Sequence, residues 1–101
     1  METLFVVQTT TESVVEAEKL IQSVINKWLC ACVQQEPIKS TYIRDWKLTT
    51  VQEIKLTFKT TLVKDLVQHI TKVHTYDTPE LIRYEVVGIK SYVDRLISQC
   101  K

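Results

Sequence analysis

Residues 51–59 read Val-Gln-Glu-Ile-Lys-Leu-Thr-Phe-Lys, a clean alternation of apolar and polar side chains. Ile54, Leu56 and Phe58 occupy alternate positions, and the positions between them carry charged or hydroxyl side chains. Successive side chains along a strand point to opposite faces of a sheet. The pattern therefore predicts a strand with one buried face and one exposed face.

The segments on either side of this strand predict a hairpin and a helix. Residues 31–44 are expected to be extended and to pair with it through a connection at Asp45–Thr50. Pro37 lies inside this extended segment and has no N–H for a sheet hydrogen bond, which favours an edge strand or a bulge. Beyond the strand, Thr60 or Thr61 is expected to cap a helix. Its core-facing stripe is Leu62, Leu66, Val67, Ile70 and Val73.

The N-terminal part of the chain predicts another strand and another helix. Leu4–Gln8 is a short apolar run typical of a strand buried on both faces, and Thr9–Glu12 is a polar break. Ser13 with Glu16 three residues later forms a capping box, which marks a helix start. This helix is expected to end near Leu29. Its predicted core stripe is Val14, Ala17, Ile21, Val24, Ile25 and Trp28.

The last quarter of the chain completes the order of elements. Leu81–Val87 predicts a strand that Gly88 breaks, and Ser91 with Asp94 predicts the start of a short helix. Strand, helix, strand, strand, helix, strand, helix is the order of two split β-α-β units with an added C-terminal helix. It indicates an α/β protein, an α+β sandwich of the ferredoxin-like type, as a single domain over residues 1–101. An edge strand and a sheet face without helices predict self-association.

Composition excludes several classes of function. The chain has 13 Lys and Arg against 12 Asp and Glu, scattered without a basic stripe, so no nucleic-acid partner is expected. Apolar runs are too short for a membrane span, and the N-terminus lacks the basic start of a signal peptide. Three cysteines fit reduced thiols better than a disulfide framework. We therefore expect a cytoplasmic protein without a membrane partner.

Residues 72–80, Lys-Val-His-Thr-Tyr-Asp-Thr-Pro-Glu, form the polar loop in which functional groups are most concentrated. His74 supplies an imidazole and Tyr76 a phenol, while Asp77 and Glu80 supply carboxylates. Loops between regular elements often carry function. This loop is therefore the first candidate site.

Landmarks along the chain resemble the CutA family, described as divalent-cation tolerance proteins. The most specific landmark is the His-x-Tyr-x-x-Pro-Glu string of the loop. The others are Ala31-Cys32-Val33, Pro37, Ser40, Tyr42, Lys59-Thr60, Val73, Gly88 and Tyr92. The sequence departs from the family pattern at Ile38, Thr75 and Arg95, and its hairpin tryptophan is displaced to Trp46.

The resemblance implies a ferredoxin-like subunit with a long central hairpin, assembled as a homotrimer. It also implies a role in divalent metal-ion (copper) tolerance or homeostasis, with ion or small-molecule binding at intersubunit clefts. Such clefts are similar to the effector sites of PII signalling proteins. The alternative is therefore a PII-like regulatory trimer that binds a metabolite or a partner protein and no physiological metal.

Metal binding and ligand binding remain alternatives at the level of residues. Family members proposed to hold copper have a cysteine at the end of the first strand, where this chain has Gln8, and a second histidine where it has Val73. His74 and Cys32 remain as candidate ligands for Cu or Zn, and these metals normally take three or four. The candidates for a ligand cleft are Tyr42, Trp46, Lys59, His74, Tyr76 and Glu80.

Catalysis is the least favoured class. Histidine has a suitable ordinary pKa for acid–base work and His74 supplies one, but no arrangement of nucleophile, base and orienting group can be read from the sequence. The single glycine excludes a glycine-rich phosphate loop. We expect a protein that is not an enzyme.

Overall fold

The computed structural model describes residues 1–100; Lys101, which belongs to the predicted domain, lies outside the described residues. The elements in chain order are β1 (Glu2–Thr11), α1 (Val14–Asn26), β2 (Cys32–Arg44), β3 (Lys47–Thr60), α2 (Val63–Val73), β4 (Leu81–Gly88) and α3 (Lys90–Gln99). This is the predicted order. None of the helices in residues 1–100 has the length and apolar character that crossing a membrane requires.

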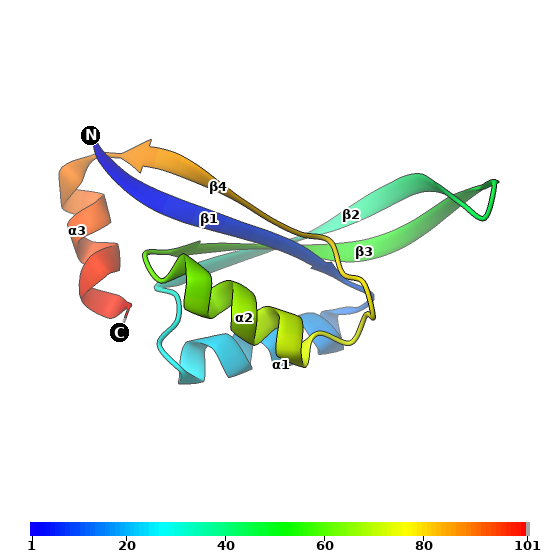
Figure 1. The fold of residues 1–101 in the computed structure, drawn as a ribbon, viewed down its shortest axis with the longest axis horizontal. Coiled ribbons are helices and arrows are strands. Elements are labelled where there is room, and N and C mark those ends of the chain that lie inside the picture. The colour runs from blue at the N-terminus through cyan, green and yellow to red at the C-terminus, as the bar shows by residue number, and fades with distance from the viewer. Residues whose placement is uncertain (101) are drawn as a thin grey trace.

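The four strands form an antiparallel sheet in the order β2-β3-β1-β4. This order and the β-α-β-β-α-β connectivity confirm the predicted ferredoxin-like fold. β2 is an edge strand, which is one of the two outcomes that Pro37 favoured, and β4 is the other edge. The β2–β3 hairpin projects well beyond the rest of the sheet (Figure 1), which gives the molecule extents of 46 × 26 × 21 Å.

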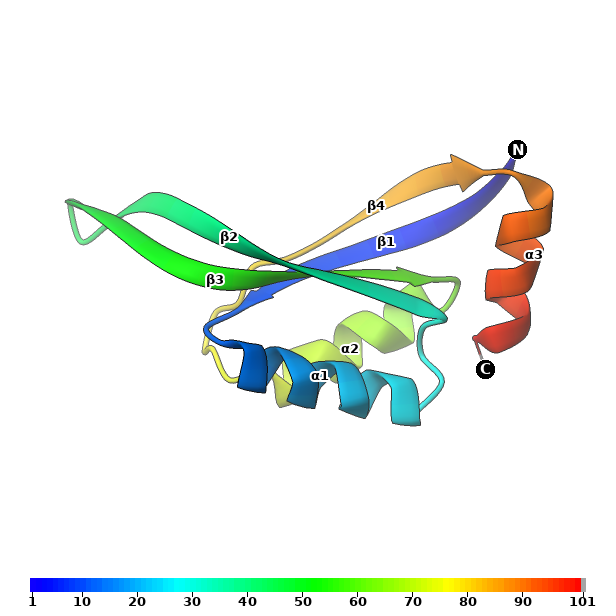
Figure 2. The ribbon, with the colours of Figure 1, turned by 180° about the vertical axis from the view of Figure 1, so that it is seen from behind.

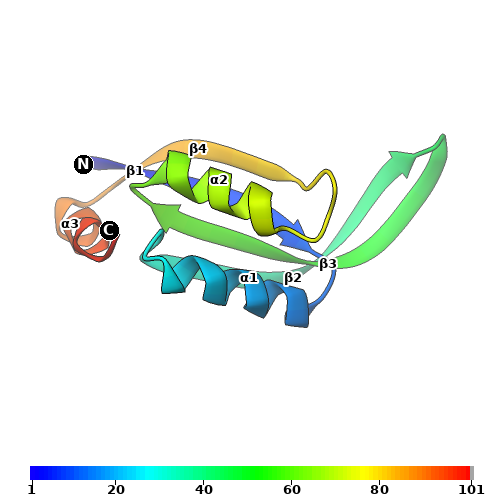
Figure 3. The same cartoon turned by 60° about the horizontal axis from the view of Figure 1, so that its bottom comes forward.

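α1 and α2 lie side by side on one face of the sheet (Figures 1 and 3). Leu56 and Phe58 are fully buried beneath them. This confirms which face of the strand was predicted to be buried from the alternation in residues 51–59. Each such side chain contributes about 1.5–3 kcal/mol by leaving water. The rest of this core comprises Val7, Ala17, Leu20, Val24, Leu29, Cys30, Leu66 and Ile70.

α1 ends at Asn26, three residues earlier than predicted, because its last turn is closed by a left-handed cap. Trp28 takes a φ of 58°, its N–H donates to Ile25, and the Leu29 N–H donates back to Val24. Glycine usually holds such a position, so the sequence gives no warning of it. Val24 and Leu29 are both buried in the core.

This early end corrects the predicted core stripe. Trp28 is 53% exposed, and Val14 and Ile25 are also exposed. Val73, from the stripe predicted for α2, is exposed as well. Leu20, absent from the predicted stripe, is buried. The stripe is confirmed at Ala17, Val24 and Ile21. It was wrong at Trp28 because it was extended past the helix end, and at Val14 and Ile25 because the helix buries a narrower face than its full set of apolar residues.

The predicted polar break at residues 9–12 is also wrong, because β1 continues to Thr11. Thr9 and Thr11 are buried, and both hydroxyls are satisfied there. The Thr9 hydroxyl donates to the Glu80 carbonyl over 2.6 Å, and that of Thr11 to the Ser13 carbonyl over 3.1 Å. Hydrogen bonding of this kind makes buried threonine acceptable in a strand.

The hairpin turn is shorter than the predicted Asp45–Thr50 connection. Asp45 and Trp46 alone make it, with φ values of 52° and 65°, and Arg44 pairs with Lys47. Two positive φ angles identify a two-residue turn whose twist matches that of the strands it joins. β3 therefore starts at Lys47 instead of residue 51.

The helix starts agree only in part with their predicted caps. Ser13 accepts a hydrogen bond from the Glu16 N–H, as the capping box predicts. α2 begins after Leu62, whose N–H donates to the Thr60 hydroxyl over 2.9 Å. Ser91 does not cap α3, which begins at Lys90 without a side-chain cap.

α3 lies across the end of the sheet, away from α1 and α2 (Figure 2). Its buried residues Val93 and Leu96 form a second, smaller core with Leu4 of β1. Lys90 and Asp94, one turn apart on its surface, form an ion pair at 2.6 Å. Most of the sheet face opposite α1 and α2 therefore carries no helix of the same chain.

Candidate functional site

The loop after α2 passes the C-terminal end of β1, and His74 fixes it there. The His74 Nε2 lies 2.8 Å from the carbonyl oxygen of Thr10, so it must carry a proton and donate. The Nδ1 accepts from the N–H of Tyr76 at 3.0 Å. Both ring nitrogens are therefore occupied, and ligation of a metal by His74 requires one of these bonds to open.

Tyr76 reaches from the loop to β3. Its hydroxyl donates to the Glu53 carboxylate over 3.1 Å, and its ring lies 5.0 Å from that of His74. Burial raises the pKa of Tyr76 to about 12, with a further contribution from the hydrogen bond to Glu53. The phenol therefore acts as a neutral donor at ordinary pH.

Glu80 closes the loop against β1. Its carboxylate accepts from the side-chain amide of Gln8 at 3.2 Å, and its carbonyl accepts from the hydroxyl of Thr9. Gln8 stands where the resemblance implies a cysteine in copper-binding relatives. Here it ties the loop to the first strand.

The remaining predicted cleft residues are spread over the chain. Trp46 is 98% exposed at the hairpin turn, whereas Tyr42, four residues before it on β2, lies near enough to Tyr76 to contribute to the rise of its pKa. Lys59 lies near α3, where its Nζ donates to the Tyr92 hydroxyl at 3.3 Å and sits 5.5 Å from the ring centre. One chain thus holds His74 and Glu80 against neighbouring residues at the end of β1, with Tyr76 beside His74 and Tyr42 near Tyr76. It does not bring Lys59 or Trp46 to them.

The candidate metal ligands are also separate. Within residues 1–100, no three His, Cys, Asp or Glu side chains gather in an arrangement that could hold a metal ion. Cys32 starts β2 and contacts the smaller core, whereas Cys30 lies before the strand in the main core. Burial, with a contribution from Cys100, raises the pKa of Cys30 to about 12. A buried protonated thiol is a poor metal ligand.

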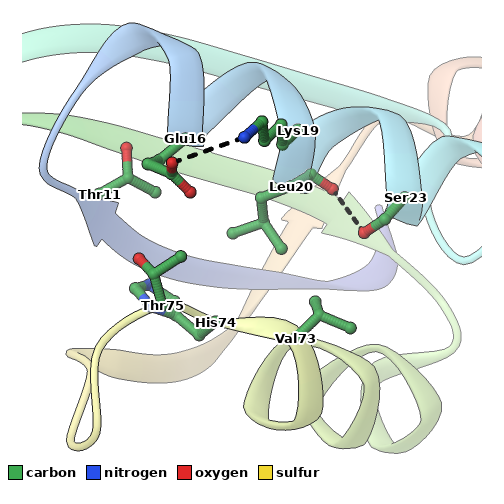
Figure 4. A pocket seen from close by; sticks show the side chains of 8 residues that line it. All are labelled: Thr11, Glu16, Lys19, Leu20, Ser23, Val73, His74 and Thr75. Atoms are coloured by element: carbon green, nitrogen blue, oxygen red, sulfur yellow. Dashed lines mark hydrogen bonds and ion pairs between the residues drawn. The ribbon is translucent and has the colours of Figure 1, made fainter.

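Beside His74, a cleft of about 330 Å³ opens between α1 and the end of α2 (Figure 4). Glu16 and Lys19 project from α1 at its rim, with 3.9 Å between carboxylate and ammonium. Thr75 and Val73 face them from the other wall. The full lining is Thr11, Glu16, Lys19, Leu20, Ser23, Val73, His74 and Thr75.

Ser23 and His69 join the two helices at this cleft. The Ser23 hydroxyl donates to the Leu20 carbonyl at 3.0 Å, so it accepts from the His69 Nε2 at 2.9 Å. A nucleophilic serine requires the opposite polarity, with histidine accepting the hydroxyl proton. Burial lowers the pKa of His69, and the nearby charges of Lys27 and Lys72 lower it further.

Sequence reasoning missed Glu53, Glu16 and Ser23 as parts of these sites. Glu53 appears in sequence only as the polar side of an alternating strand, 23 residues from Tyr76. Glu16 appears only as half of a capping box. No local signal predicts which polar face a distant loop or helix will meet, because that depends on the packing of β1, β3 and α2.

Residues 5–99 match the family model described as CutA1 divalent ion tolerance protein. A divalent-cation tolerance protein CutA from Pyrococcus horikoshii is 28% identical over 101 residues, covering 97% of this chain and 99% of the relative. A chloroplastic CutA protein from Arabidopsis thaliana is 35% identical over 74 residues. That match covers 70% of this chain and only 41% of the longer plant protein.

Among solved structures, CutA from Synechococcus elongatus superposes with a TM-score of 0.94 at 30% sequence identity. The alignment covers 100% of this chain and 93% of that structure. The likeness therefore includes the long hairpin, both helices on the sheet and α3, not only the central sheet.

Proposed function

This chain belongs to the CutA1 divalent ion tolerance family, and on that premise we propose that it acts as a homotrimer in divalent-cation tolerance. In this proposal the trimer binds an ion or a small molecule at clefts between subunits. The names of the relatives support a role in cation tolerance. Copper is the ion that we propose to test first.

The observation that carries the trimer proposal is the exposed apolar surface on the sheet face opposite α1 and α2. On β4, Ile82 is 48% and Tyr84 is 44% exposed, and they stand opposite Gln8 and Val6 of β1. Their side chains therefore lie on the other face of the sheet from Val7, which packs in the helix-covered core. A second copy would remove this surface from water at about 25 cal/mol per Å².

A metabolite or partner protein in place of a metal is the second candidate, and the bonds of His74 favour it. Both His74 ring nitrogens are engaged, and Gln8 replaces the cysteine that the resemblance implies for copper-binding relatives. We further propose a binding role in the cytoplasm without catalysis. The three free thiols support a reducing compartment.

Native mass spectrometry of the wild type and of Tyr84→Lys tests the assembly. We expect a trimer for the wild type and monomers for the variant, because a lysine ammonium on the buried face would lose its water without a partner. Gln68→Lys places the same charge on the exposed side of α2 and is expected to leave the trimer intact. A monomeric wild type would overturn the proposal.

The hypothesis of metal binding is tested by titrating Cu(II) and Zn(II) into the assembled protein in competition with a chelator. If His74 is a ligand, His74→Ala abolishes stoichiometric binding and His69→Ala does not. Equal binding by His74→Ala and the wild type would exclude His74 as a ligand. Thermal stabilisation by an organic ligand that persists in chelator would instead support the metabolite reading.

A further inference from the structure

A second cleft, of about 310 Å³, lies between the first two turns of α2 and the edge strand β4. Its lining is Val63, Lys64, Val67, Gln68 and Arg83. Arg83 pairs with Val7 of β1, whose side chain packs in the helix-covered core. Because paired residues of antiparallel strands share a face, the Arg83 side chain lies on the side of the sheet that α2 covers. The cleft therefore has one cation on its helix wall and one on its strand wall.

Neither cation is neutralised within the subunit. None of the ion pairs within residues 1–100 includes Lys64 or Arg83. Asp65 follows Lys64 in the chain, and Glu85 lies two residues from Arg83 on the same face of β4, but both are outside the lining. Two cations at one cleft without a carboxylate in its lining produce a positive potential there.

The cleft also has hydrogen-bond donors for an anion. The Arg83 guanidinium presents a planar fork of N–H groups that matches phosphate and carboxylate oxygens. The Lys64 ammonium and the side-chain amide of Gln68, one turn further along α2, supply more donors. None of these three side chains donates a hydrogen bond to another group within residues 1–100. Val63 and Val67, both half-buried, give the cleft an apolar part.

We propose that this cleft binds a small organic phosphate monoester. The phosphate group lies between Lys64 and Arg83 and accepts from Gln68, and the organic group contacts Val63 and Val67. A phosphate dianion matches the two cations in charge, whereas a monoanion leaves one of them unmatched. The volume equals the share of about ten water molecules in the liquid, more than a phosphate group alone fills. It is at the lower end of the range for small-molecule sites.

This site is independent of the proposed trimer and of any metal, because its lining residues all belong to one chain. Ile82 and Tyr84, which form the apolar surface proposed for the trimer, alternate with Arg83 along β4 and point to the opposite face. The trimer and metal binding are tested by native mass spectrometry and metal titration. Failure of either part of the proposed function would leave the phosphate site standing.

Three probes test the proposal on the wild-type protein at constant ionic strength: propyl phosphate, 1-propanesulfonate and inorganic phosphate. At about pH 8 propyl phosphate carries two charges, while 1-propanesulfonate has a similar shape with one charge and inorganic phosphate lacks the organic group. The readout is the shift of backbone amide resonances in heteronuclear NMR spectra. We expect propyl phosphate to shift the amides of Lys64, Gln68 and Arg83, and to bind at least about fivefold more tightly than the other two probes.

Each other result of these titrations would contradict a part of the proposal. Equal binding of 1-propanesulfonate would overturn the assignment of a dianion, and equal binding of inorganic phosphate would overturn the assignment of an organic ester. If these three amides did not shift at about 10 mM propyl phosphate, the site itself would be overturned.

Arg83→Gln provides the second arm, because it removes the charge of an exposed side chain and keeps an amide donor. We expect it to weaken the binding of propyl phosphate at least about fivefold. Arg95→Gln makes the same change of net charge at an exposed position of α3, outside the cleft, and is expected to leave binding unchanged. Equal weakening by both variants would show a general effect of charge and contradict the assignment. Unchanged binding in Arg83→Gln would do so as well.

Discussion

The phenolic hydroxyl of Tyr76 donates to the carboxylate of Glu53 across 3.1 Å. This bond joins the loop after α2 to β3 just before the hairpin leaves the sheet. His74 fixes the backbone beneath Tyr76, so the two side chains position the loop together.

Tyr76→Phe removes this bond without removing the ring. We expect a loss of about 1 kcal/mol in the free energy of unfolding, since a hydrogen bond to a charged group is lost at a half-exposed site. Urea denaturation measures it. Tyr84→Phe serves as the control for the loss of a hydroxyl, and an equal effect of both variants would show that the bond to Glu53 contributes nothing.

The raised pKa of Tyr76 predicts alkaline destabilisation. Its pKa is about 12 in the folded chain against an ordinary 10.0, so the folded state favours the protonated phenol. The corresponding stability is complete below about pH 10 and is lost as the pH rises through about 12. A titration of tyrosinate absorbance should show the highest-pH step disappear in Tyr76→Phe. If Tyr76→Phe instead removed a titration step near pH 10.0, the ordinary pKa of tyrosine, the raised pKa of Tyr76 would be refuted.

His69 predicts a loss of stability in acid. Its folded-state pKa lies below the ordinary 6.5 because of burial and the charges of Lys27 and Lys72. The folded chain therefore binds the proton less readily than the unfolded chain does. The contribution of neutral His69 to the free energy of unfolding is complete above about pH 6.5 and is lost as the pH falls through the folded-state pKa of His69.

Thermal unfolding at a series of pH values measures this effect. His69→Gln should flatten the dependence below about pH 6.5, because glutamine does not titrate. Lys64→Gln, which removes a charge near the other end of α2, should leave the dependence in place. A dependence unchanged in His69→Gln would assign the acid sensitivity to other groups.

The hairpin turn offers a stabilising substitution. Trp46 is 98% exposed and holds a φ of 65°, which costs a residue with a Cβ about 1 kcal/mol. Trp46→Gly should therefore stabilise the isolated subunit by up to about 1 kcal/mol. Ile43→Gly, on the neighbouring strand, should destabilise it. Urea denaturation of the two variants measures this, and destabilisation of the subunit by Trp46→Gly would contradict the strain assigned to the turn.

Thiol reactivity should separate the three cysteines. Cys30 is 3% exposed with a pKa of about 12, and its burial both blocks access and disfavours the thiolate. The raised pKa leaves Cys30 with a much smaller thiolate population than an ordinary cysteine has. Brief treatment with iodoacetamide, followed by peptide mass mapping, should modify Cys32 and Cys100 well before Cys30. Modification of Cys30 first would contradict the burial.

The sequence alone determined the fold class, because side-chain parity and helical spacing are local properties. The alternation of residues 51–59 identified Leu56 and Phe58 as core, and Pro37 identified an edge strand. The loop at residues 72–80 was identified from its polar composition alone. Its His74, Tyr76 and Glu80 do lie together in the structure, since few residues separate them.

Only the tertiary structure decided where α1 ends, how short the hairpin turn is, and which distant groups meet. Trp28, Asp45 and Trp46 take left-handed backbone conformations that glycine or asparagine normally signals, so the local sequence points elsewhere. Tyr76 meets Glu53, and Lys59 meets Tyr92 instead of the loop, because the order and register of the strands place them so. Those contacts depend on packing over the whole sheet, which no local pattern encodes.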